Sequence, residues 1–328
     1  MKPAALLTTA LLGLCAALVT ASPASAQQAA WPAAKPIRIL VAFGPGSASD
    51  LFARMVSEQL QKSLSQSVVV ENRPGASGQI AAELVAAAPG DGYTLFLTTN
   101  TTHSANPHLF KSLRYDPIKD FTPVVRIANF PFAVLVRGDS PIGTLRELIA
   151  QTRTSAKGMS YAYTSSAGQV AAAALANSLS LDLVGVAYKA APEAITSVIS
   201  GQVDFTVLDF ATTRSMLESR RLKAIAVTPA QRSTLAPDLP TIAEETSLKD
   251  FGTVAWMGIF GPANLPAPIL ERLSRDLMLI LDADEFRKRI AAMGAEPAIA
   301  GPAPFAAFVA SELQVWKRLI ELARMQPE

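Results

Sequence analysis

A turn near the start of the chain is rich in glycine and serine. Gly44-Pro45-Gly46-Ser47-Ala48-Ser49-Asp50 follows an apolar run and precedes a segment with helical spacing. A turn that opens a helix directs backbone N–H groups and the positive end of the helix dipole to one point, where a carboxylate is stabilised. Ser47 and Ser49 add hydroxyl donors, but Ser47 and Asp50 also have the spacing of a capping box. Two roles therefore stay open for these side chains, ligand contact and helix capping.

Other chemistries have less support in the residues. The turn matches only part of a Gly-x-Gly-x-x-Gly nucleotide fingerprint, because its third glycine position is Ser49. The chain has no Gly-x-Ser-x-Gly elbow and no Ser-x-x-Lys motif. His103 and His108 have no neighbouring carboxylate to complete a metal site. We therefore expect no catalytic residue, no metal and no cofactor.

Two further polar loops follow predicted strands. Thr99-Asn100-Thr101-Thr102 is one, and Thr164-Ser165-Ser166-Ala167-Gly168 is the other. Ligands of open α/β sheets bind beyond the carboxyl ends of the strands, although the same residues also suit ordinary turns. None of the three loops contains Lys or Arg. An anion held there would therefore depend on backbone amides and hydroxyls.

The elements that position these loops alternate along the chain. Short apolar runs and longer amphipathic segments predict an α/β fold with mostly parallel sheets. The predicted strands are 36–43, 68–70, 94–98, 159–163, 184–188, 203–208 and 223–228, and the predicted helices include 79–88, 145–152, 169–178 and 193–200.

Two extended apolar segments predict crossings between two lobes. They are Val124–Val136, which Pro131 interrupts, and Gly252–Phe260. From Ala267 to Arg324 the pattern is almost entirely helical. The predicted limits are 27–130 plus 252–328 for lobe 1 and 131–251 for lobe 2. Such a layout encloses a cleft between hinged lobes.

Composition indicates an exported globular chain. The 328 residues are half apolar and 17% charged, which suits two packed domains. Lys2, the apolar run 4–20 and Ala24-Ser25-Ala26 predict a cleaved signal peptide over residues 1–26. Its removal takes away Cys15, the single cysteine, and lowers the formal net charge from +2 to +1. Disulfides, thiolate chemistry and nucleic-acid binding are therefore not expected.

Ordered sequence blocks resemble one known family over essentially the whole mature chain. They include Lys35-Pro36-Ile37-Arg38, Val68-Val69-Val70-Glu71-Asn72-Arg73-Pro74-Gly75-Ala76, Asp91-Gly92-Tyr93-Thr94-Leu95, Tyr115-Asp116-Pro117, Gly201-Gln202-Val203-Asp204, Pro237-Asp238-Leu239-Pro240-Thr241 and Trp256-x-Gly258. The sequence resembles the periplasmic solute receptors of tripartite tricarboxylate transporters, often called the Bug family.

The resemblance implies a fold, a ligand class and partners. It implies two α/β lobes of the type II periplasmic-binding architecture that close on a small organic acid, a mono- or dicarboxylate. The loop after the first strand and the loop opening the second lobe would hold its carboxylate through amides, hydroxyls and waters. Implied partners are integral-membrane permease subunits or, alternatively, the sensor domain of a signalling partner. We expect a periplasmic monomer.

The match has departures at the second loop. Ser165 and Ala167 stand where the family has glycine, and Ala171 stands where it has histidine. Without glycine these positions lose easy access to positive φ, so either the loop path differs or the pocket is narrower. Tyr163 would then be a wall of the pocket or a packing residue between the lobes.

The candidate ligand-binding residues combine the three loops with two further positions that match the family. They are Phe43, Pro45, Gly46, Ser47, Ser49, Asp50, Thr99, Asn100, Thr101, Thr164, Ser165, Ser166, Ala167, Gly168, Tyr188 and Asp209. Asp209 follows a predicted strand. It would repel an anionic ligand unless that ligand carries an amine or a hydroxyl donor.

Overall fold

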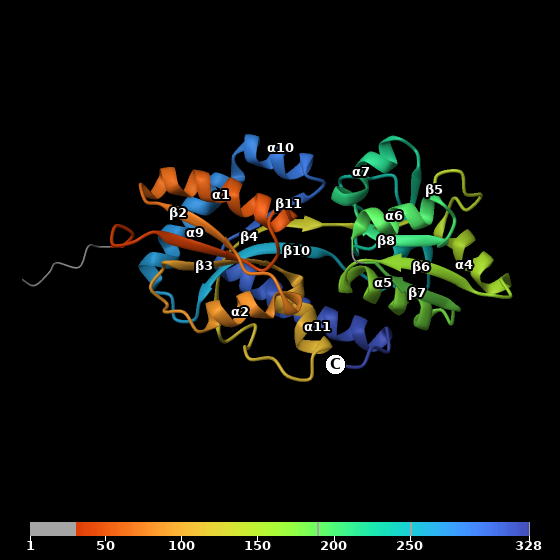
Figure 1. Ribbon diagram of the computed structural model, residues 1–328, viewed down its shortest axis with the longest axis horizontal. Coiled ribbons are helices and arrows are strands. Elements are labelled where there is room, and N and C mark those ends of the chain that lie inside the picture. The colour runs from red at the N-terminus through yellow and green to blue at the C-terminus, as the bar shows by residue number, and fades with distance from the viewer. Residues whose placement is uncertain (1–30, 189, 250, 328) are drawn as a thin grey trace, which may run out of the picture.

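Two β-sheets, each flanked by helices, lie side by side along the long axis of the molecule (Figure 1). The computed structural model describes residues 31–188, 190–249 and 251–327. The predicted signal peptide lies outside these residues. The predicted α/β class and two-lobe architecture are confirmed. We use lobe 1 for the elements around the first sheet and lobe 2 for those around the second.

Lobe 1 contains a six-stranded sheet. Its spatial order is β11 (Glu296–Ala300), β4 (Phe121–Phe130), β10 (Ala255–Pro262), β3 (Thr94–Thr99), β1 (Ile37–Val41) and β2 (Val68–Asn72). Its helices are α1 (Ala48–Leu64), α2 (Gln79–Ala86), α3 (Asn106–Leu109), α9 (Ala267–Asp282), α10 (Asp284–Ala292) and α11 (Pro302–Leu322), with a 3-10 turn at Ala76–Gly78 and a π-helical turn at Thr101–Ala105.

Lobe 2 contains a five-stranded sheet. Its spatial order is β7 (Leu183–Ala187), β6 (Met159–Tyr163), β8 (Phe205–Asp209), β5 (Phe132–Arg137) and β9 (Leu222–Val227). Its helices are α4 (Leu145–Thr154), α5 (Ser166–Ser178), α6 (Ala191–Ile199), α7 (Phe210–Glu218) and α8 (Ile242–Glu245). The predicted domain limits at residues 130 and 252 fall between the two sheets and stay a prediction.

Both sheets are mixed, so the expectation of mostly parallel sheets is wrong in this detail. In lobe 1, β1 pairs in parallel with β2 and β3, but β10 is antiparallel to β3 and to β4. In lobe 2, β5 is antiparallel to both β8 and β9. The reason is the connection between the lobes, because the chain leaves lobe 1 on β4 and returns to it on β10.

The expectation of an almost entirely helical C-terminal region is also wrong. β11 lies between the predicted breaks at Gly294 and Gly301 and forms an edge of the lobe 1 sheet. Its sequence, EPAIA, is short, contains a proline and pairs with β4 through an irregular register. Such a strand has a weak sequence pattern and is tolerated at a sheet edge.

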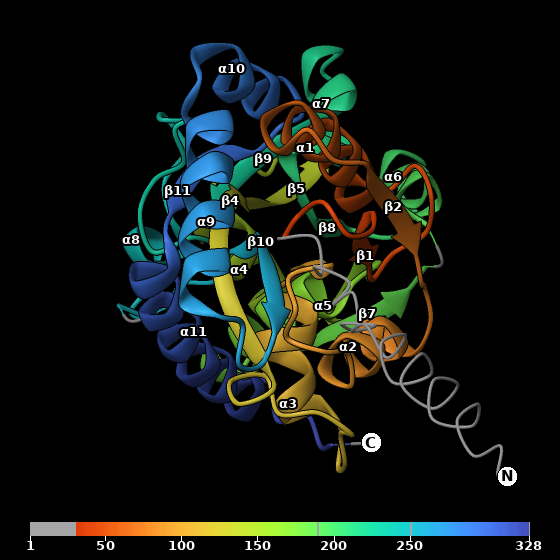
Figure 2. The same ribbon diagram turned by 90° about the vertical axis from the view of Figure 1, so that its left-hand side faces the viewer.

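Alternation of side chains along the strands builds a core on each face of the lobe 1 sheet. Ile37, Ile39 and Val41 pack with α1 and α9, whereas Leu40 packs with α2 on the opposite face. Figure 2 shows α1 and α2 on opposite sides of the strands of this sheet. This packing fixes the carboxyl ends of β1 and β3, from which two of the polar loops emerge.

The C-terminal helix α11 ties the two lobes together. Phe305 and Val309 belong to the lobe 1 core, whereas Trp316, Leu319 and Ile320 belong to the lobe 2 core. In Figure 1 the helix lies below the junction of the lobes. Its length of 21 residues spans about 30 Å, which is enough to reach both cores.

A buried ionisable pair lies at the middle of α11. Glu312 is 8% exposed and is attracted to Arg126 of β4, whose guanidinium carbon lies 3.3 Å from the centre of the Phe308 ring. Burial raises the pKa of Glu312 to about 7, although Arg126 opposes that shift. Burial also lowers the pKa of Arg126 to about 10, so Arg126 stays charged at neutral pH. For both groups, burial therefore has a larger effect on the pKa than their mutual attraction.

This pair predicts a pH-dependent stability. The folded chain binds the Glu312 proton more tightly than the unfolded chain, so the free energy of unfolding falls as pH rises from about 4.5 to about 7. Glu312→Gln removes this loss. The change that it causes in the free energy of unfolding should therefore be more favourable at pH 8 than at pH 4, by up to about 3 kcal/mol. Urea unfolding at several pH values measures it, with the exposed Glu321→Gln on the same helix as control. An unchanged pH slope in Glu312→Gln would contradict the prediction.

Candidate functional site

A cavity of about 500 Å³ lies between the two lobes. The sequence-predicted residues that line it are Phe43, Ser47, Ser49, Thr99, Asn100, Thr101, Ser165, Ser166, Ala167 and Asp209. All three polar loops therefore contribute to one cavity. The predicted residues that do not line it are Pro45, Gly46, Asp50, Thr164, Gly168 and Tyr188.

The first loop is held by contacts within lobe 1. Ser47 caps α1, because its Oγ accepts a hydrogen bond from the Asp50 N–H at 3.2 Å. Asp50 is 3% exposed; its carboxylate accepts from the Gly46 N–H at 3.0 Å and from Arg54 Nε at 3.1 Å. Burial alone would raise the pKa of Asp50, but these hydrogen bonds outweigh it and lower the pKa. Asp50 therefore shapes the turn and keeps Arg54 occupied rather than lining the cavity.

Two polar side chains of lobe 1 face the cavity. Ser49 is 4% and Asn100 is 2% exposed as whole residues, and both line the cavity. Among the described residues, neither side chain has a hydrogen-bond partner. Their polar atoms are not among the fully enclosed unpaired atoms of the described chain, so they are open to the cavity. Ser49 and Asn100 can therefore donate hydrogen bonds to a ligand bound there.

The Asn100 loop is fixed by a hydrogen-bond chain behind it. Thr98 Oγ1 and Thr102 Oγ1 lie 2.7 Å apart, and Thr102 Oγ1 lies 2.9 Å from His103 Nδ1. The His103 ring is fully buried and stacks on Phe260, with 4.0 Å between ring centroids. Burial lowers the pKa of His103 to about 3, so its ring is neutral at physiological pH. His103 therefore supports the loop from the core.

The second loop begins helix α5 of lobe 2. Ser165 caps this helix and accepts from the Gly168 N–H at 3.4 Å. Its φ is −145°, which any residue adopts, so the departure from glycine causes no backbone strain here. A Cβ on Gly168 would lie 2.5 Å from the carbonyl oxygen of Val207, so this glycine allows α5 to approach β8 closely. Gly168 is therefore a packing position.

Asp209 lies at the start of α7, beside this second loop. Its Oδ1 accepts from the Thr212 N–H at 2.8 Å, and both carboxylate oxygens lie 2.9 Å from Thr212 Oγ1. Asp209 thus caps α7 with a carboxylate, whereas Ser47 and Ser165 cap their helices with neutral hydroxyls.

The other predicted residues have structural roles or lie at the edge of the site. Tyr163 contacts Tyr161, with ring centroids 5.8 Å apart, and packs against the lobe 2 core. Tyr188 packs against a second lobe 2 cluster. Neither role expected for Tyr163 is found, because it does not line the cavity and it packs within lobe 2 rather than between the lobes. His108 Nε2 lies 2.9 Å from the Leu313 carbonyl oxygen and joins α3 to α11.

Sequence reasoning missed the apolar part of the cavity. The additional lining residues are Ala48, Leu51, Phe130, Phe132, Ala211, Thr212, Ala255, Met257 and Met293. The largest of them lie on the crossing strands or next to a helix end. Phe130-Pro131-Phe132, at the break in the first crossing, was a signal that could have identified two of them.

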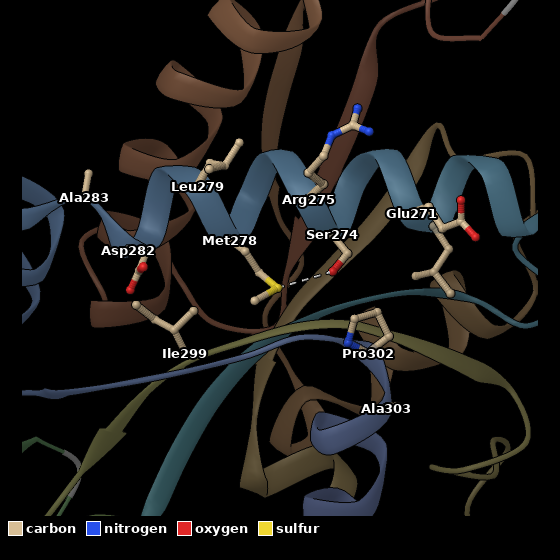
Figure 3. Close-up of a pocket in the computed structure, with 11 residues that line it drawn as sticks. Glu271, Ser274, Arg275, Met278, Leu279, Asp282, Ala283, Ile299, Pro302 and Ala303 are labelled. Atoms are coloured by element: carbon tan, nitrogen blue, oxygen red, sulfur yellow. Dashed lines mark hydrogen bonds between the residues drawn. The ribbon is translucent and has the colours of Figure 1, made fainter.

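A larger hollow, of about 960 Å³, lies elsewhere on lobe 1 (Figure 3). Helix α9 forms one side with Met278 and Leu279, and Ile299 and Pro302 form the other. None of the predicted ligand-binding residues lines it, and lobe 2 does not contribute to it. The smaller cavity between the lobes is therefore the candidate site.

The cavity suits an anion at one end and an apolar group beyond it. The first-turn N–H groups of α1 and α5 have no acceptor within their own helices, and these helices reach the cavity from opposite lobes. Their positive ends, with Ser49 and Asn100, form what we call the donor end. Among the described residues, no group of His, Cys, Asp and Glu has the arrangement of a metal site.

Comparison with known proteins defines the family. The sequence profile of the tripartite tricarboxylate transporter family receptors matches residues 52–325. A UPF0065 protein of Bordetella bronchiseptica is 34% identical over 310 residues, which cover 94% of this chain and 92% of the relative. The chain therefore belongs to the tripartite tricarboxylate transporter receptor family, whose members are periplasmic solute-binding proteins.

Solved structures support the same assignment. Rpa4515 of R. palustris, determined with adipate, has a TM-score of 0.79 and 29% identity, and the match covers 91% of this chain and all of that one. MatC from Rhodopseudomonas palustris, determined with bound malate, has a TM-score of 0.72 and 30% identity, with 87% and 99% coverage. No helix in the described part of this chain is long and apolar enough to cross a membrane.

The two roles of Ser47 predict two separable effects of Ser47→Ala. Loss of the α1 cap should lower the free energy of unfolding by about 1 kcal/mol. Loss of a hydroxyl that lines the cavity should weaken carboxylate binding by roughly 0.5–1.5 kcal/mol. Denaturant unfolding and calorimetry measure the two effects. Thr144→Ala is the matched control, because Thr144 caps α4 outside the cavity. If Ser47→Ala binds carboxylates as tightly as the wild type, Ser47 only caps α1 and does not contact the ligand.

Gly46 has a backbone requirement of its own. An added Cβ at Gly46 meets no atom of the described chain within 4 Å. Its φ of +79° instead explains the glycine, because a β-branched residue is strained there. Gly46→Val should therefore strain the backbone and change the shape of the turn before α1.

Proposed function

We propose that this chain is an extracytoplasmic receptor that binds a small organic acid between its lobes, with the ligand carboxylate at the donor end. The observation that carries the proposal is that the donor side chains Ser49 and Asn100, which have no hydrogen-bond partner among the described residues, line the cavity beside the N-termini of α1 and α5. A carboxylate accepts several hydrogen bonds at once and is favoured by both helix dipoles. The adipate and malate named with two related structures support this ligand class.

We further propose that the receptor acts in the periplasm and delivers its ligand to permease subunits of the tripartite tricarboxylate type. Membership of the family supports this role, and the apolar run at residues 4–20 supports export. The alternative is a receptor that serves a signalling partner. Deleting the gene separates the two, because lost uptake indicates transport, whereas normal uptake with a lost transcriptional response indicates sensing.

Binding itself is tested with purified protein and a set of carboxylates. Calorimetry should show one ligand per chain. At a free ligand concentration of 100 Kd, the free energy of unfolding should rise by about 2.7 kcal/mol. Failure of a wide range of carboxylates to bind or to stabilise the protein would contradict the proposal.

The donor end is tested with Asn100→Asp. This nearly isosteric change places a negative charge beside the expected carboxylate and should weaken binding by about tenfold or more. Asn264→Asp is the control, because Asn264 is exposed in lobe 1 and does not line the cavity. Wild-type affinity in Asn100→Asp would exclude a carboxylate at this end.

A further inference from the structure

Outside the three polar loops, Asp209 and Thr212, the described cavity wall is apolar. Phe43 of the first loop, Phe130 and Phe132 of the lobe crossing, Met257 of β10 and Met293 after α10 all line it. Phe130 and Phe132 are each 7% exposed, and Met257 is 1% exposed. Burying an apolar ligand group against such a surface is favourable by about 0.8 kcal/mol per CH₂. The body of the ligand therefore contacts hydrocarbon and thioether groups.

Only one end of the cavity is built for an anion. Three helices, α1, α5 and α7, begin at the cavity, but α7 has its own carboxylate at its N-terminus. Asp209 already occupies the Thr212 N–H and hydroxyl. The positive end of α7 is thus neutralised by a carboxylate that lines the cavity, whereas α1 and α5 are capped by serines. Asp50 also lies in the first turn of α1, but its carboxylate is paired with Arg54 and the Gly46 N–H and does not line the cavity.

Among the described residues, the cavity lining contains no Arg, Lys or His that could accept a second carboxylate. Arg54, four residues beyond Asp50, is engaged by the Asp50 carboxylate with an Nη2–Oδ1 distance of 3.0 Å. Asp209 lies at the end of β8, which is the immediate neighbour of β6, the strand that leads to Ser165. Neighbouring strands lie about 4.8 Å apart, so a ligand group that extends from Ser165 across this sheet edge approaches Asp209.

We propose that the site selects organic acids with one carboxylate and an apolar body, and that Asp209 disfavours a second carboxylate. This inference rests on the proposed function, because it places the first carboxylate at the donor end. It separates this chain from a receptor for di- or tricarboxylates. The ligand group that lies next to Asp209 is therefore a hydrogen-bond donor or a neutral group.

Hexanoate and adipate form a matched pair of probes. Both have six carbons, and adipate replaces the terminal methyl of hexanoate with a carboxylate. Calorimetry should show hexanoate binding at least about tenfold more tightly than adipate. Affinity should also rise about fourfold per CH₂ along acetate, butyrate and hexanoate. Rpa4515, whose structure was determined with adipate, serves as the positive control for adipate binding.

Asp209→Asn tests the role of the carboxylate. Asparagine caps helices as well as aspartate does, so α7 should persist while its charge is removed. Adipate affinity should rise about tenfold and hexanoate affinity should change less than about twofold. Asp209→Ser is a second neutral cap if the first variant folds poorly. Glu218→Gln is the control, because it removes the same charge at the opposite end of α7, about 13 Å along the helix.

The outcomes distinguish this inference from the proposed function. Adipate binding as tightly as hexanoate in the wild type, or an equal effect of Asp209→Asn on both ligands, overturns the inference and leaves a carboxylate receptor in place. Equal affinities for acetate, butyrate and hexanoate would contradict the claim that the site binds an apolar ligand body. Binding of no carboxylate by the folded protein overturns both the inference and the proposed function.

Discussion

The serine caps of α1 and α5 leave the first N–H groups of each helix without an acceptor among the described residues. Both helix ends reach one cavity, which Ser49 and Asn100 line with side chains that have no hydrogen-bond partner among the described residues. In the same cavity α7 meets this need internally with Asp209. The contrast assigns different chemistry to the two regions. One region offers hydrogen-bond donors to a ligand, and the other places the Asp209 carboxylate in the cavity wall.

The rest of the fold keeps these helix ends together. β4 leads through the single residue Pro131 into β5, so the first crossing is short. The return from β9 to β10 takes the 27 residues 228–254, and β10 then pairs with β4. On one side of the cavity, Glu296 of β11 accepts from Ser233 Oγ at 2.7 Å and from the Thr234 N–H at 2.6 Å, across the lobes. On another, α11 packs into both cores. These contacts set the separation of the two loops that form the donor end.

Much of the architecture could be predicted from periodicity and turn chemistry. The β6 strand at residues 159–163 and the crossing interrupted by Pro131 have clear apolar runs, and both are confirmed. Helix α5 begins three residues earlier than predicted, because Ser165 rather than the first apolar residue defines its start. β11 escaped prediction because a five-residue edge strand between helices has almost no periodic signal.

The polar part of the site was easier to predict than its apolar part. Loops after strands carry Ser, Thr, Asn and Gly in a pattern that a sequence displays, so Ser49 and Asn100 could be selected. Met257 and Phe132 look like ordinary core residues in the sequence. Apolar strand residues that line the cavity cannot be distinguished there from those that face a core. The sequence also does not show that Asp50 turns inward to Gly46 and Arg54, since that choice depends on the three-dimensional path of the turn.

A crystal structure with 6-bromohexanoate would test the central claim most directly, because the anomalous signal of bromine marks one end of the ligand. The account predicts the carboxylate within about 2.7–3.2 Å of donors at Ser49 and Asn100, with the bromine among Phe130, Phe132 and Met257. A ligand bound in the reverse direction, with its carboxylate at Thr212, or bound outside the cavity between the lobes, would contradict it.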